Sequence, residues 1–354
     1  MKPQTLQKTA LALLVGWYAA NAAAYSEQGQ AGNTKSWESA EYLKDWGLTS
    51  MNASTAYALG FNGSGVKIGV MDSGVLLNHP EFQDGRIHVV KTEGTYSKDG
   101  MRYPDASVGN GPINKNEPVK NGKRNFDKTD NGIFTKGEAF NIDGAWHKYT
   151  NDAHGTHVGG TMAASRDGNE MHGVAFGANL YSANTGGNDN MTYGPNQDYS
   201  FFLQGYSALA DAGAKVINNS WGSNRRVNSS FAGAQGYKPK YDWRDVPEYG
   251  VQYYDVPKAP EPISSPAAHI YLSNLGEAEK AYYQFVTSGE KNFVDAAYEV
   301  AKNKQVIQVF TAGNRSMMAE SFTRAMLPYF RPDAEKYWVN VTGQVGGEGY
   351  PNDS

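Results

Sequence analysis

Strand-length apolar runs that alternate with helical patterns constrain this chain more than any other feature of its sequence. The segment from Val66 to Met71 is mostly apolar, has glycine-rich turns beside it and leads into Asp72-Ser73-Gly74. This pattern is typical of a strand buried on both faces of a parallel sheet. Similar runs are Arg86 to Val90, Leu180 to Ala183, Lys215 to Asn219, Gln305 to Thr311 and Tyr337 to Thr342, and helical patterns cover Ala53 to Leu59, His154 to Ala164, Tyr199 to Ala212 and Phe293 to Lys302. The sequence therefore predicts an α/β fold, a mainly parallel sheet flanked by helices.

Two long segments interrupt this alternation, residues 91–150 and residues 224–290. Both are rich in Gly, Asn, Pro, Lys and Tyr and contain few convincing elements, so we expect surface insertions that carry function or mobility. Residues 25–50 are mostly polar or small and predict a short N-terminal arm, with the first ordered element in the helix that begins near Ala53. The rest of the chain, residues 51–354, is predicted to form one domain.

Composition excludes several classes of function. With no cysteine, the chain has no disulfide, no thiol nucleophile and no thiolate metal site. Its formal net charge of -4 gives no basic surface for nucleic acid. Residues 1–24 predict a secretory signal peptide, with basic Lys2 and Lys8, an apolar run from Leu11 to Ala20 and a small-residue cleavage site ending at Ala24. An exported protein without cysteine favours a bacterial source, with placement at the cell surface, in the outer membrane or outside the cell.

Two segments carry an acid and a base suited to catalysis. Asp72 ends the strand that begins near Val66, although Asp followed by Ser-Gly is by itself more typical of a turn. His154 opens a helical segment rich in small residues, Asp152-Ala153-His154-Gly155-Thr156-His157-Val158-Gly159-Gly160-Thr161. His154 is alternatively a structural histidine, or it shares a metal ion with His157, which lies on the same helix face. The glutamate of an H-E-x-x-H zinc site is missing after His154.

Two further strand ends carry polar groups. Asn314 ends the segment Val309-Phe310-Thr311-Ala312-Gly313-Asn314, where it serves either as a turn residue or as a hydrogen-bond donor to an oxyanion. The segment Val216-Ile217-Asn218-Asn219-Ser220-Trp221-Gly222 ends another strand, and its backbone is suited to pairing with an extended peptide.

Together these motifs resemble the subtilisin family of serine proteases, in which the aspartate precedes the histidine along the chain. The resemblance implies that Asp72 orients the imidazole, that His154 is the general base, and that Asn314 is the oxyanion donor. It makes His157 structural and places substrate on Ser220, Trp221 and Gly222. Trp221 is bulkier than the aliphatic residue expected there, so we hypothesise that it narrows a neighbouring specificity pocket. The implied substrates are proteins or peptides.

The nucleophile of such an enzyme is missing from the sequence. No Gly-Thr-Ser segment follows Asn314, Ser316 lies too close to that residue to face His154, and Ser354 has no helix to open. We therefore expect a fragment, incomplete at its C-terminus, of a serine endopeptidase whose serine lies beyond residue 354. In its lack of cysteine and its long insertions, the chain also resembles bacterial autotransporter subtilases. That resemblance implies an outer-membrane barrel after residue 354. A structural calcium ion stays unassigned because no segment has EF-hand spacing, and catalysis requires no cofactor.

Two other classes of function remain open from the sequence. One is a non-catalytic secreted surface antigen or peptide-binding remnant of a subtilase. The other is a zinc hydrolase that uses His154 and His157. A serine-directed inhibitor and a chelator would separate these three hypotheses.

Overall fold

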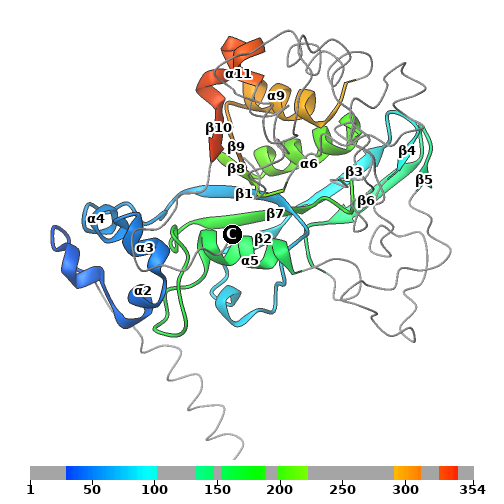
Figure 1. Cartoon of the computed structure of the whole chain (residues 1–354). Helices are drawn as coiled ribbons and strands as arrows, with labels where there is room; N and C mark the ends of the chain where they lie inside the picture. The colour runs from blue at the N-terminus through cyan, green and yellow to red at the C-terminus, as the bar shows by residue number, and fades with distance from the viewer. Residues whose placement is uncertain are drawn as a thin grey trace, which may run out of the picture. The chain divides into compact units, whose positions relative to one another are not determined.

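A six-stranded parallel sheet positions the candidate site in the computed structural model (Figure 1). The structure describes residues 29–101, 133–146, 153–188, 198–221, 291–311 and 327–341. The spatial order of the sheet is β10-β9-β8-β1-β7-β2, and its neighbouring strands are parallel. The strands are β1 (Lys67–Asp72), β2 (Ile87–Val89), β7 (Asn179–Asn184), β8 (Val216–Asn219), β9 (Ile307–Thr311) and β10 (Trp338–Val341). Because these strands are parallel, the carboxyl ends of β1, β7, β8 and β9 lie at the same edge of the sheet.

Helices cover both faces of this sheet. Helices α6 (Tyr199–Asp211) and α9 (Phe293–Lys304) lie on one face and α5 (His154–Ala163) lies on the other (Figure 1). The larger core is buried on the α6 and α9 side, with members that include Met71, Ile217 and Phe310 from the sheet and Phe201, Phe202, Tyr206 and Phe293 from the helices. Three short helices are also described in the part of the chain that contains the sheet, η2 (Pro80–Phe82), α11 (Leu327–Phe330) and η6 (Pro332–Tyr337). The predicted α/β architecture is confirmed.

The region after β2 corrects one prediction. Strand β3 (Lys91–Thr95) pairs antiparallel with β6 (Ala139–Asp143), and β4 (Gly100–Met101) pairs antiparallel with β5 (Ile133–Phe134). The prediction of few regular elements in residues 91–150 is therefore wrong for the described parts of that segment. Strands β3 and β6 bury only alternate residues. Each therefore has a short, half-polar sequence that is hard to distinguish from the turn-forming residues around it. Residues 224–290 lie outside the described residues.

The N-terminal helices belong to a separate compact unit, built within Met1–Ser64 and Gly160–Gly177. They are η1 (Thr34–Trp37), α2 (Ala40–Lys44), α3 (Trp46–Ser50) and α4 (Ala53–Ala58). The predicted helix at α4 is confirmed, but it is not the first ordered element, because three short helices precede it. Side-chain caps explain three of these starts, since Asn33 caps η1, Ser39 caps α2 and Asp45 caps α3.

This smaller unit is held by buried aromatic and acidic side chains. Tyr57 donates a hydrogen bond from its hydroxyl to the carbonyl of Val174 at 2.8 Å. The carboxylate of Glu41 accepts the backbone N–H groups of Asp167 and Gly168 at 3.2 and 3.1 Å. Burial raises the pKa of Glu41 above its ordinary value, and the two N–H donors oppose that shift. The arm is therefore tied to residues far along the chain.

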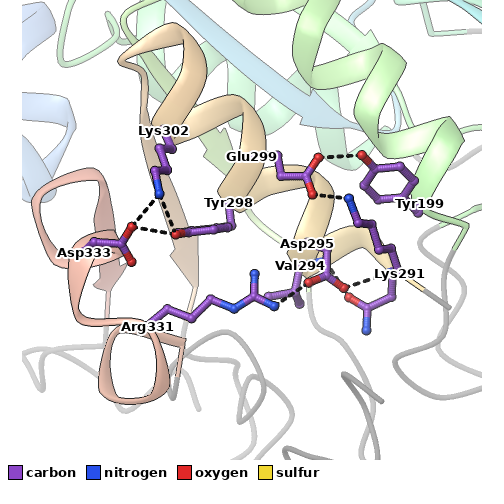
Figure 2. Close-up of polar contacts among 10 residues, drawn as sticks. Tyr199, Lys291, Val294, Asp295, Tyr298, Glu299, Lys302, Arg331 and Asp333 are labelled. Atoms are coloured by element: carbon purple, nitrogen blue, oxygen red, sulfur yellow. Dashed lines mark hydrogen bonds and ion pairs between the residues drawn. The ribbon is translucent and has the colours of Figure 1, made fainter. Parts of the chain in front are cut away.

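Helix α9 is fixed at both ends by polar contacts (Figure 2). Asn292 and Asp295 form a capping box at its N-terminus, and the Asp295 carboxylate also pairs with Arg331 at 2.7 Å. Near its other end, Lys302 pairs with Asp333 of η6 at 2.9 Å. These contacts join α9 to Arg331 and to η6, the helix that directly precedes β10.

Candidate active site

Asp72 is the last residue of β1, the strand between β7 and β8. Its backbone carbonyl accepts the N–H of Thr185 at 2.8 Å, so the segment after β7 holds the strand end. Its side chain is only 3% exposed. Oδ1 accepts the N–H of Ser73 at 2.7 Å, whereas Oδ2 is buried without a hydrogen-bond partner among the described residues. The hydrogen bond at Oδ1 therefore sets the orientation of the Asp72 carboxylate.

His154 is the first residue of α5, and its ring meets this carboxylate. Nδ1 of His154 lies 2.8 Å from Oδ1 of Asp72, and the histidine side chain is 48% exposed. Because a carboxylate only accepts, Nδ1 carries the proton and donates it. In the neutral ring Nε2 then holds the lone pair and can act as a base. A buried acid thus orients a half-exposed base.

Glycine allows α5 to approach the end of β1 closely. A β-carbon at Gly155 would lie 2.5 Å from the carbonyl oxygen of Gly74 and 3.0 Å from the nitrogen of Ser73. In its absence, the N–H of Gly155 donates to Oγ of Ser73 at 2.8 Å. A second link joins the N–H of Leu76 to Oγ1 of Thr156 at 3.0 Å.

These two hydrogen bonds add Ser73 and Thr156 to the site, two residues that the sequence interpretation did not assign to it. Ser73 and Thr156 each follow closely on a predicted catalytic residue, and each hydroxyl binds a backbone N–H of the opposite motif. Small hydroxyl residues beside both Asp72 and His154 were the available indication. Gly74 contributes through its conformation, with φ of +89° and no space for a β-carbon beside the carbonyl of Ala145.

The predicted substrate-binding segment follows β8. Ser220 accepts a hydrogen bond on Oγ from the side-chain amide of Asn218 at 2.8 Å. The ring of Trp221 is buried, and its Nε1–H donates to the carbonyl of Met71 at 2.8 Å. Gly222 lies outside the described residues. The specificity effect of Trp221 stays a prediction, while its observed contact is with the strand that carries Asp72.

The predicted oxyanion donor, Asn314, also lies outside the described residues, which include β9 only to Thr311. Strand β9 pairs with β8 in parallel register from Val216↔Ile307 to Asn219↔Phe310. Strand β9 therefore ends at the same edge of the sheet as β1, which carries Asp72, and β8, which leads to Ser220.

In the parts of the chain that the structure describes, no three acidic or histidine side chains gather where they could hold a metal ion. None of the helices there is long and apolar enough to cross a membrane.

Comparison with known proteins decides the family. Residues 63–345 match the Subtilase family, Peptidase_S8. The chain belongs to the subtilase family. Subtilases are serine proteases, so the resemblance inferred from the Asp72 and His154 motifs is confirmed at the level of the family.

The relatives of this subtilase are bacterial proteases. An extracellular serine protease of Serratia marcescens is 29% identical over 343 residues, which cover 95% of this chain and 26% of the relative. Bacillopeptidase F of Bacillus subtilis (strain 168) is 29% identical over 276 residues, covering 73% of this chain and 16% of the relative. The crystal structure of fervidolysin from Fervidobacterium pennivorans matches with a TM-score of 0.34 and 16% identity over 84% of this chain and 30% of that one. This chain thus spans about a quarter of the length of the Serratia relative.

Proposed function

We propose that this chain carries the acid and the base of an Asp-His-Ser triad in a secreted serine endopeptidase. The observation that carries the proposal is the 2.8 Å contact between Nδ1 of His154 and Oδ1 of Asp72, at the carboxyl edge of the sheet. Family membership supports the class of reaction.

In this mechanism His154 removes the proton of a serine hydroxyl through Nε2 and later returns it to the leaving amine. Asp72 holds the ring in the tautomer that leaves Nε2 free of hydrogen, and its negative charge stabilises the imidazolium that forms. The nearly complete burial of Asp72 keeps that charge from being screened by water. We propose that the nucleophile is a serine outside these 354 residues, because no Gly-Thr-Ser segment follows Asn314.

Substrate binding is proposed to use the segment from Ser220 to Gly222 as an added strand, with Asn314 donating to the oxyanion. The parallel neighbours β1, β8 and β9 support this arrangement, because their ends share one edge. The signal-like N-terminus and the extracellular relatives in Serratia support export. Cell-surface placement, the autotransporter architecture and a structural calcium ion stay predictions.

The test is a pair of histidine variants made in the full-length protein. We expect His154→Ala to abolish peptide hydrolysis and labelling by a fluorophosphonate, whereas His157→Gln retains both. A zinc hydrolase would instead lose activity in both variants and after chelation. A wild-type protein that binds peptides without cleaving them or taking up the label would support the non-catalytic alternative.

A further inference from the structure

The peptide groups before and after Asp72 each accept a hydrogen bond, one from the segment that follows β8 and the other from the segment that follows β7. On one side, the N–H of Thr185, which follows β7, donates to the carbonyl of Asp72 at 2.8 Å. On the other side, the register between β1 and β8 runs from Ile68↔Val216 to Val70↔Asn218. Beyond that register, the carbonyl of Met71 accepts the indole N–H of Trp221.

The indole is placed to make this bond by its packing. The ring centroid of Trp221 lies 5.4 Å from that of Phe202 and 5.3 Å from that of Phe293, and only 7% of the residue is exposed. Met71 is completely buried. The hydrogen bond therefore lies in an apolar region, where loss of the donor cannot easily be replaced by water.

The backbone of the same tryptophan belongs to the proposed substrate-binding segment. We propose that Trp221 is a positioning residue that couples this segment to the Asp72–His154 pair, through the hydrogen bond from its indole to the Met71 carbonyl. The inference rests on the proposed function. A displacement of the Met71 peptide moves Asp72, the next residue, and the single oxygen of Asp72 that contacts His154 moves with it.

The decisive variant replaces Trp221 with benzothienylalanine, in which sulfur takes the place of the indole N–H. Its shape preserves the packing on Phe202 and Phe293, so the protein is expected to fold. Trp221→Phe serves as a second variant that also removes the donor. Phe201→Leu is the matched control, because this fully buried ring lies in the same core and packs on Phe140 and Phe202.

The first readout needs no catalysis. Selective NMR of the histidine rings, with the His154 signal assigned by its loss in His154→Gln, follows the titration of His154 in the 354-residue chain. We expect the His154 ring of the benzothienylalanine protein to titrate at a lower pH than that of the wild type, because a displaced carboxylate stabilises the imidazolium less well. Phe201→Leu should lower the melting temperature and leave this midpoint unchanged.

The second readout is steady-state hydrolysis by the complete protein. We expect kcat to fall about tenfold, KM to change less than twofold, and the acidic limb of the rate profile to move to lower pH. A wild-type midpoint and kcat in the benzothienylalanine protein would overturn the proposal and leave Trp221 as a packing residue. A rise in KM alone would also overturn it, in favour of a pocket-forming role. If the wild-type protein lacks activity, the proposed function fails while the NMR result still decides the coupling.

Discussion

Replacing Gly155 with alanine tests how the site is assembled. The added β-carbon would lie 2.5 Å from the carbonyl oxygen of Gly74, and ordinary contacts begin near 3.4 Å. Because the obstructing atoms are backbone, α5 and the end of β1 must separate by about 0.9 Å, from the difference between those distances. The distance between Nδ1 of His154 and Oδ1 of Asp72, now 2.8 Å, would then be too long for a hydrogen bond.

The expected cost is about 1–3 kcal/mol of unfolding free energy for the overpacking, and about 10²-fold in kcat for misplacing the base. Urea unfolding measures the first quantity and hydrolysis by the complete protein measures the second. The control is Gly160→Ala in the same helix, where no described atom lies within 4 Å of the added β-carbon. Apart from the backbone of its own helix, nothing described crowds this position, so Gly160→Ala should be as stable as the wild type or more stable by up to about 1 kcal/mol. Equal effects of the two substitutions would refute the close-approach argument.

Two further predictions concern stability. Burial lowers the pKa of His172 below its ordinary 6.5, and the ring nitrogen Nδ1 contacts the carbonyl of Gly173. The unfolded chain therefore binds a proton at His172 more readily than the folded chain does. The free energy of unfolding should accordingly fall as the pH drops below about 6.5. His172→Asn keeps a donor for that carbonyl and should reduce this slope, as measured by chemical denaturation at pH 7 and 5.5; an unchanged slope would contradict the assignment. Arg331→Met should lower the unfolding free energy by about 1–3 kcal/mol, because it removes a hydrogen-bond donor from Asp295, whose side chain is only 6% exposed. Lys302→Met removes an exposed ion pair and should cost less than about 1 kcal/mol in the same assay.

Much of the fold could be predicted from short-range pattern. The segment before Asp72 is a mostly apolar run and the segments of α6 and α9 have helical patterns, and the predicted positions of all three agree with the structure. Strands β3 and β6 could not be predicted in the same way. Their pairing joins residues far apart in the chain, as in Thr92↔Ile142, and each strand alone is short and half-polar. The N-terminal helices were missed for a similar reason, because contacts such as that of Glu41 with Gly168 stabilise them.

The sequence by itself determined the fold class and singled out Asp72 and His154 as the candidate acid and base, because they stand in motifs that combine a strand end, a helix start and small residues. Only the tertiary structure decided that the Asp72 carboxylate is buried, that one of its oxygens contacts the His154 ring, and that the indole of Trp221 donates a hydrogen bond to the neighbouring Met71 carbonyl. Burial and hydrogen-bond geometry depend on how distant segments pack. Local sequence therefore specifies the chemical groups, whereas the packed sheet and helices set their distances.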